Sequence, residues 1–262
     1  MTTVNDIYAF IRTLAPEYMA EQWDRVGLNC GRGDQEVHHI LVALDTFPHV
    51  CREAIDKGAD LLVTHHALIW EPGFVNDCTV TGRSLLDLIE HHIAHINAHT
   101  NLDCAPGGVN DLLAAKLGLT DIQVIEPRGT DDTGRPWGLL RQGTTESQSL
   151  EQFLSQVKNA LGCQGLRYVD CGKAVNRVAV GGGACTGEML QAVRAGCDTF
   201  VTADAKYNQF WDAKHLGLQL IDAGHFHTEN PVCEYLAQKL QEAFPAVKVT
   251  PSAHLTDCAK FF

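Results

Sequence analysis

The 262-residue sequence predicts an α/β protein made of two related halves, each with a partly parallel, mixed sheet covered by helices. Short runs rich in β-branched residues alternate with amphipathic segments, which is the usual order of strands and helices in this class. The same order returns later in the chain with several of the same residues, which indicates an internal repeat.

In the first half, apolar residues at helical spacing predict a helix over residues 4–14, which Pro16 ends. A strand is expected at 40–44, a helix at 49–57 and a second strand at 61–64. This strand–helix–strand order predicts a right-handed crossover and a parallel pair. Two further elements follow, a helix at 83–92 and a strand at 95–98.

The repeat rests on residue pairs that share a single offset along the chain. The pairs are Val37 with Val175, Ile40 with Val178, Val42 with Val180, Gly58 with Gly196, Asp60 with Asp198, Val63 with Val201 and Thr64 with Thr202. A chance likeness between two generic units is the alternative, because valine and glycine recur in such units. We expect the two halves to pack about a pseudo-twofold axis.

Residues 127–143 are rich in glycine, proline and aspartate and predict a boundary. The expected organisation is a first half over residues 1–126, a second half over 127–224 and a C-terminal segment over 225–262. That segment should contain a helix at 229–243 and a strand at 246–249, and we expect it to pack back on the first half.

Composition narrows the possible functions. A formal charge of -12 opposes direct nucleic-acid binding. The lack of a long apolar run predicts no membrane association, and a cytoplasmic location is expected. Ten cysteines without a C-x-x-C pair indicate reduced thiols. Histidine is unusually frequent, with 13 residues, and several of them lie close together in the sequence.

These histidines and several carboxylates lie where predicted strands end. His65 and His66 follow one strand, and His99 and Asp103 follow the next. Because parallel strands end at the same edge of a sheet, these side chains should converge there. In the second half Asp204 follows one strand and His225 the next. Glu229 lies one helical turn beyond His225, so both side chains can face one pocket.

The combined set of three imidazoles and two carboxylates predicts a dinuclear metal centre between the halves. Its expected ligands are His65, His66, Asp103, His225 and Glu229. Two divalent ions, of zinc, iron or manganese, would activate a bridging water for hydrolysis, with Glu229 or Asp103 as the bridging, catalytic carboxylate. Each residue alone could equally end a strand or cap a helix.

Several stretches resemble the family of Nif-three-like dinuclear metal hexameric proteins, often labelled GTP cyclohydrolase 1 type 2 homologues. The matching stretches are Glu21–Leu28, Asp60–His66, Ala98–Asp103, Val201–Tyr207 and Ile221–His225 with Glu229. The resemblance implies the same metal ligands, a homohexamer, and cyclohydrolase-like hydrolysis of a small nucleotide-like or phosphorylated substrate. A metal-binding regulatory or scaffold protein without turnover is the alternative.

Other candidates have competing interpretations. His91, His92 and His95 are expected on a solvated face, and His99 either orients a ligand or is structural. His227 could reach the mouth of the pocket, and Gly181–Gly183 is interpreted as a tight turn. Trp23 and Asp24 are expected to pack and cap, although an aromatic ring near a nucleotide pocket could stack a base. Cys104 follows Asp103, but nothing in the sequence points to a base that would activate it.

Overall fold

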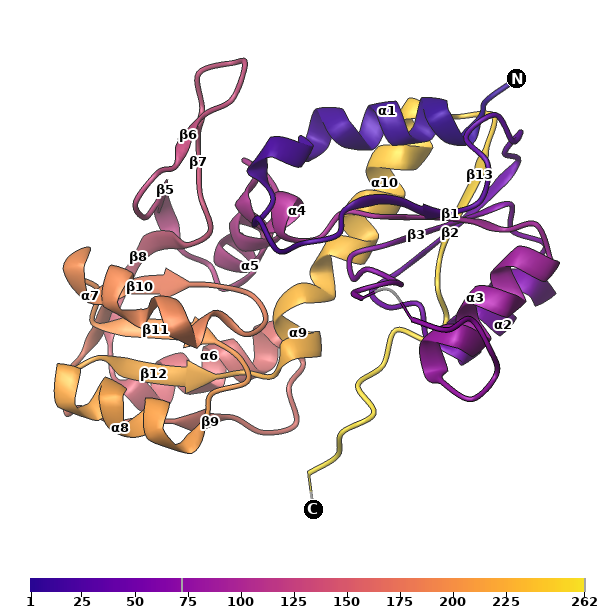
Figure 1. The fold of residues 1–262 in the computed structure, drawn as a ribbon. Coiled ribbons are helices and arrows are strands. Elements are labelled where there is room, and N and C mark those ends of the chain that lie inside the picture. Colours follow the sequence, from indigo (N-terminus) through magenta and orange to yellow (C-terminus); the bar gives the residue numbers. More distant parts are fainter. Residues whose placement is uncertain (72, 262) are drawn as a thin grey trace. The chain divides into compact units, whose positions relative to one another are not determined.

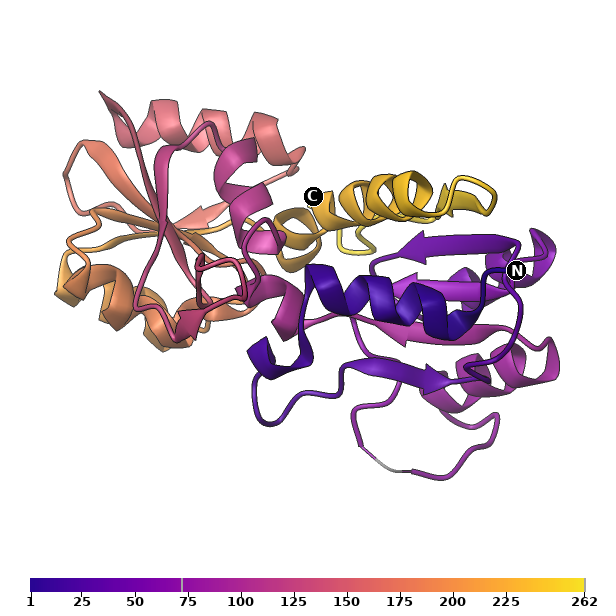
Figure 2. The same ribbon diagram turned by 90° about the horizontal axis from the view of Figure 1, so that it is seen from above.

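The structure is a computed structural model that describes residues 1–71 and 73–261. It confirms the α/β class, since helices and strands alternate along the chain and the sheets are mixed (Figures 1 and 2). The chain divides into two compact units. The first combines Met1–Leu102 with Val232–Thr256, and the second combines Asp103–Pro231 with the residues from Asp257 onward. Among the described residues, no helix has both the length and the apolar character needed to cross a bilayer.

The described part of the first unit holds a five-stranded sheet. Its strands, in spatial order, are β1 (Gly27–Cys30), β4 (Ala94–Asn97), β3 (Leu61–Thr64), β2 (His39–Ala43) and β13 (Lys248–Pro251). Pairing is parallel from β4 to β13, and β1 joins β4 in antiparallel orientation. The predicted parallel pair of β2 and β3 is therefore confirmed.

Helices cover both faces of this sheet. Figure 1 shows α1 (Val4–Leu14) and α10 (Pro231–Ala243) on one face, and α2 (Pro48–Asp56) and α3 (Val80–Glu90) on the other. A capping box at Thr3 starts α1, where the predicted helix begins. On the opposite face, Leu41 and Leu62 of the sheet pack against Val50 of α2 and Leu88 of α3.

The second unit is built on a six-stranded sheet, counted over its described residues. The spatial order is β5 (Thr120–Val124), β8 (Arg141–Gln148), β10 (Val175–Val180), β11 (Thr199–Thr202), β12 (Gln219–Asp222) and β9 (Arg167–Tyr168). The three strands β10, β11 and β12 are parallel, and the others pair in antiparallel orientation. A short hairpin of β6 (Gly129–Thr130) and β7 (Pro136–Trp137) stands apart from this sheet.

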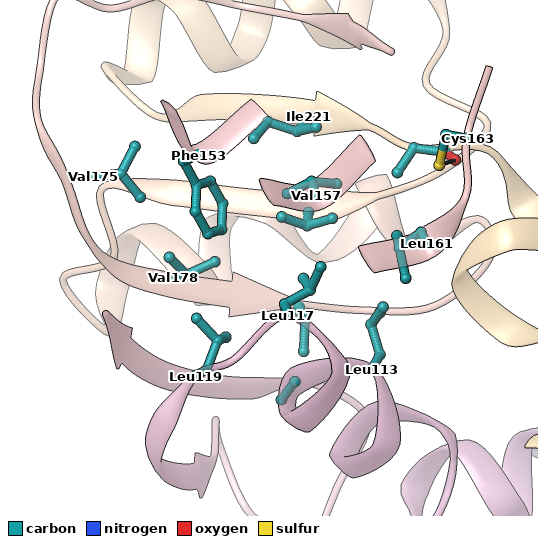
Figure 3. Packing of buried hydrophobic residues seen from close by; sticks show 14 of the residues in the cluster. Leu113, Leu117, Leu119, Phe153, Val157, Leu161, Cys163, Val175, Val178 and Ile221 are labelled. Atoms are coloured by element: carbon teal, nitrogen blue, oxygen red, sulfur yellow. Dashed lines mark hydrogen bonds between the residues drawn. The ribbon is translucent and has the colours of Figure 1, made fainter. Parts of the chain in front are cut away.

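Two apolar cores sandwich the second sheet. On one face, α5 (Val109–Lys116) and α6 (Leu150–Leu161) contribute Leu113 and Phe153, which pack with Val178 and Ile221 of the strands (Figure 3). The other face is covered by α7 (Met189–Arg194) and α8 (Tyr207–Leu216). Burial of the apolar side chains in these two cores makes the main favourable contribution to the folding free energy of the unit.

The unit boundaries differ from the predicted division at residues 127–143. Residues 103–126 belong to the second unit because Leu113, Leu117 and Leu119 are buried in the same core as Phe153. The C-terminal segment is also divided: α9 (His225–Glu229) belongs to the second unit, and β13 joins the sheet of the first. The last strand, β13, begins and ends two residues later than the predicted strand at 246–249.

The internal repeat stays a prediction, but one matched pair makes the same contact in each unit. Asp60 accepts hydrogen bonds from the backbone N–H groups of His38 and His39 at 2.7 and 2.9 Å. Asp198 accepts equivalent bonds from Asn176 and Arg177 at 3.0 and 2.8 Å. Each carboxylate thus ties the start of one parallel strand to the start of the next.

His95 was expected on a solvated face with His91 and His92, and that expectation is wrong. His91 and His92 are exposed, whereas His95 is fully buried in β4, because β1 and β3 flank that strand. Its Nε2 lies 2.7 Å from the hydroxyl of Thr64, which itself donates to the backbone oxygen of His66. His95 therefore donates to Thr64, and burial lowers its pKa to about 3.

This burial predicts an acid-dependent loss of stability. In the unfolded chain the ring takes a proton below its ordinary pKa of about 6.5, whereas the folded protein resists protonation until about pH 3. The contribution of His95 to the free energy of unfolding should be constant above pH 6.5. Below that pH it should decrease by about 1.4 kcal/mol per pH unit. In His95→Gln, urea unfolding of the metal-free protein at pH 4 to 7 should show a slope smaller by that amount. The exposed His91→Gln is the control, and equal slopes in both variants would contradict the assignment.

Candidate metal centre

The turn after β3 places His65 and His66 at the carboxyl end of the first sheet. Its backbone is fixed by the bond from the Thr64 hydroxyl to the oxygen of His66 at 2.6 Å, and by the bond from the His66 N–H to the oxygen of Leu44 at 2.9 Å. His65 is buried and His66 is partly buried. The two imidazoles are thus held by main-chain contacts before any ligand is considered.

Both imidazoles are oriented through Nδ1. His65 Nδ1 lies 2.9 Å from the backbone oxygen of Ala98, and His66 Nδ1 lies 2.7 Å from Oδ1 of Asp45. A carbonyl or a carboxylate oxygen can only accept, so each Nδ1 carries the proton and donates it. The lone pair is then on Nε2, which is the form of histidine that binds a divalent metal.

His99 belongs to the same group. Its Nδ1 lies 2.9 Å from Oδ2 of the buried Asp24, which also accepts from the backbone N–H and the hydroxyl of Thr100. Burial works against ionisation of Asp24, but these bonds outweigh it and lower its pKa to about 2. Ring nitrogens of His65, His66 and His99 all lie within 4.8 Å of one another, so the first unit holds a three-imidazole group that could bind a metal.

In the second unit, α9 carries His225 and Glu229 on one face, one helical turn apart. His225 Nδ1 lies 2.7 Å from Oδ2 of Asp204, and its Nε2 lies 2.9 Å from Oε2 of Glu229. With the proton of Nδ1 donated to Asp204, the Nε2 lone pair and the Glu229 carboxylate meet as two electron-rich groups. A cation or an additional proton stabilises such a pair, so this arrangement fits a metal.

Asp204 reaches His225 from a strained backbone conformation. It follows the end of β11 with a φ of 52°, in the left-handed region that aspartate tolerates better than most residues. Non-glycine residues held in this region are often found at functional sites.

A glycine turn after β10 packs directly on Glu229. A Cβ at Gly183, where φ is 61°, would overlap the Oε1 of Glu229 and lie 3.1 Å from Cε1 of His225. At Gly182 a Cβ would lie 3.2 Å from Cγ of Glu229. The glycines were expected to form a tight turn, and the structure shows that this turn leaves the space that the Glu229 carboxylate occupies.

Asp103 is buried in α4 (Thr100–Cys104), and Asn110 links its backbone to the glycine turn. The amide nitrogen of Asn110 donates to the oxygen of Asp103 at 3.2 Å, and its side-chain oxygen accepts from the N–H of Gly182 at 2.7 Å. Burial, followed by the charges of Asp103 and Glu229, raises the pKa of the Cys185 thiol well above its usual range. Cys185 therefore stays protonated, and Asp103 and Glu229 belong to a group of residues that could hold a metal ion.

The structure thus places two of the five predicted ligands, His65 and His66, in the first unit, and the other three, Asp103, His225 and Glu229, in the second. Three residues that contact these ligands, Asp45, Asn110 and Gly183, were not identified as such from the sequence, and Asp24, which binds His99, was not identified either. Asp45 alone had a visible signal, since it follows a predicted strand as His65 does. His227 lies with Nδ1 3.2 Å from the oxygen of Leu161 in the second unit.

The chain was also compared with known proteins. A family model described as Duf34/NIF3 (NGG1p interacting factor 3) matches residues 2–257. The chain belongs to this family. NIF3 relatives named GTP cyclohydrolase 1 type 2 homolog include one from Clostridium perfringens, 34% identical over 91% of each chain. Another, from Streptomyces coelicolor, is 37% identical over 92% of this chain and 87% of its own.

Solved structures of NIF3-related proteins have the same fold. A Bacillus cereus protein related to NIF3 superposes with a TM-score of 0.93 at 26% identity, covering 100% of this chain and 99% of its own. A Staphylococcus aureus hypothetical protein gives a TM-score of 0.92 at 30% identity, covering 99% of each chain. The resemblance stated from the sequence motifs is therefore confirmed for this NIF3 chain.

The contact between Gly183 and Glu229 predicts a specific loss of metal binding. Gly183→Ala should push the Glu229 carboxylate from its position and weaken metal affinity by about tenfold or more, the usual range for residues that orient ligands. Isothermal titration with Zn²⁺ would measure the change. Gly172→Ala is the matched control, because Gly172 has a similar φ of 69° but no atom within 4 Å of a Cβ. Equal affinity in both variants would show that the contact does not matter.

Proposed function

We propose that this NIF3 protein is a metal-dependent hydrolase of a small nucleotide-like or phosphorylated substrate. Two divalent ions would be held by His65, His66, Asp103, His225 and Glu229. One observation carries the proposal: His65, His66 and His225 each place Nδ1 beside an oxygen acceptor, so all three rings share the tautomer with the proton on Nδ1, which is the form of histidine that binds a metal through Nε2. A structural role would not require the same tautomer at all three positions.

The donor set also indicates the kind of ion. Imidazole nitrogens and carboxylate oxygens suit zinc, iron and manganese, and the thiol of Cys185 stays protonated beside them. When bound, such ions lower the pKa of water and polarise a substrate oxygen. The hydrogen bonds that the imidazoles donate to Ala98, Asp45 and Asp204 keep the rings in the tautomer that binds a metal.

The carboxylates have a separate role in the proposed reaction. Glu229 is a buried carboxylate beside His225, and we assign it the role of taking the proton that an attacking water releases. Asp103 is buried as well and supplies the second carboxylate. The nucleotide-like substrate class is supported by the name that the curated relatives carry, GTP cyclohydrolase 1 type 2 homolog.

Metal content is the first test. Protein purified without chelators or an affinity tag should carry close to two divalent ions per chain by elemental analysis. His66→Ala and His225→Ala should each lower that number, because each removes one imidazole ligand. The control is His215→Ala, which removes an exposed histidine of α8. Failure to bind any metal, even after loading with zinc, iron and manganese, would overturn the metal centre.

Turnover is the second test. Metal-loaded protein should hydrolyse a member of a panel of nucleotides, phosphoesters and cyclic amidines, with GTP included. Glu229→Gln should lower kcat by about 100-fold or more, the range expected when a proton-transfer group is removed. Glu234→Gln, an exposed glutamate on α10, is the control, and the metal content of both variants is measured alongside. Full metal occupancy without turnover on the whole panel would favour the non-enzymatic metal-binding alternative.

A further inference from the structure

Two exposed tryptophans converge on His99 in the first unit. Trp23 is 60% exposed and Trp70 is 43% exposed, yet their ring centroids lie only 6.3 Å apart with an interplanar angle of 32°. The centroid of the His99 ring lies 5.9 Å from that of Trp23 and 5.0 Å from that of Trp70. We propose that Trp23 and Trp70 form a stacking site for a planar heteroaromatic ring of the substrate.

Hydrogen bonds hold the backbone segment around Trp23 in place, although the indole ring of Trp23 is exposed to solvent. The next residue, Asp24, is buried and bonded to His99 and to both donors of Thr100. A third contact runs from the backbone N–H of Glu21 to the hydroxyl of Thr100 at 2.9 Å. A large apolar ring held in a set position outside the core is a feature of ligand-binding surfaces, because its exposure costs free energy that binding recovers.

The shape of the surface favours a flat ligand. The planes of the two indoles are inclined by 32° to each other, and the His99 ring stands at 69° and 79° to them. Aromatic faces of this kind bind planar heterocycles by stacking, and they tolerate different ring substituents because every such ring has a π face.

The position of the pair relates it to the metal centre. His99 contacts both indoles, and its ring centroid lies 5.1 Å from that of His65 and 5.5 Å from that of His66. A ring stacked on the tryptophans is therefore held next to the three-imidazole group. The inference rests on the proposed function only in taking that ring as part of the substrate, and ring binding itself can be measured without turnover.

The test measures binding to metal-free protein, in which hydrolysis cannot proceed. GTP is the probe that carries a ring, and inorganic tripolyphosphate is the ring-free probe. We expect GTP to quench tryptophan fluorescence, and the Kd from calorimetry to rise about tenfold in Trp23→Ala and in Trp70→Ala, as is usual for the loss of one stacking side chain. Trp23→Phe should recover part of the affinity, and the Kd for tripolyphosphate should stay unchanged in all variants.

Trp211→Ala is the matched control. Trp211 is 53% exposed on α8 and also lies beside a histidine, His215, at a centroid distance of 6.1 Å. Its removal should leave the Kd for GTP unchanged. The proposal is overturned if Trp23→Ala and Trp70→Ala bind GTP like the wild type, or if they change only the oligomeric mass measured by light scattering. Ring-dependent GTP binding to the metal-free protein, together with no turnover by the metal-loaded protein on the whole panel, would reject the hydrolase and keep the stacking site. Turnover by the metal-loaded protein, with unaltered GTP binding in the tryptophan variants, would reject the stacking site and keep the hydrolase.

Discussion

The candidate centre depends on one kind of hydrogen bond, from the Nδ1 of a histidine to an oxygen on a neighbouring segment. In the first unit those oxygens come from strands on either side of β3. Asp45 follows β2 and fixes His66, and Ala98 follows β4 and fixes His65. The parallel pairing of β2, β3 and β4 brings the three strand ends together, so the sheet itself sets the tautomer of both imidazoles.

The second unit uses the same kind of bond at His225 and adds other contacts to it. Helical spacing pairs His225 with Glu229, and Asp204 accepts the hydrogen bond from Nδ1 of His225. The turn at Gly182 and Gly183 lies against the side chain of Glu229. Asn110 then joins this turn to the backbone of Asp103. Buried polar groups are costly unless each has a partner, and the Asn110 side chain supplies one both to the backbone oxygen of Asp103 and to the N–H of Gly182.

The sequence was sufficient to predict the α/β class, the strand ends that carry His65 and His66, and the helical pairing of His225 with Glu229. Short continuous apolar runs and the helical period of 3.6 residues determine these features. The roles of Asp45, Asp24 and His99 could not be predicted, because they depend on which strand ends lie side by side. The burial of His95 was missed for a related reason: β1 is short and polar in its middle, so the pattern did not reveal the strand that covers β4. The unit boundaries differ because the leucines of residues 113–119 pack with α6, a contact that no local signal contains.

The place of β13 in the first sheet has a consequence for the order of synthesis. This strand comes after the whole α/β portion of the second unit in the chain, yet it pairs along the length of β2. Thr250 and Ala253 around it are bonded to His39 and Glu53 of the first segment. During synthesis, β2 therefore remains an unpaired sheet edge while some 200 further residues are translated. In that period, pairing of β2 with a strand of another nascent chain competes with its pairing to β13.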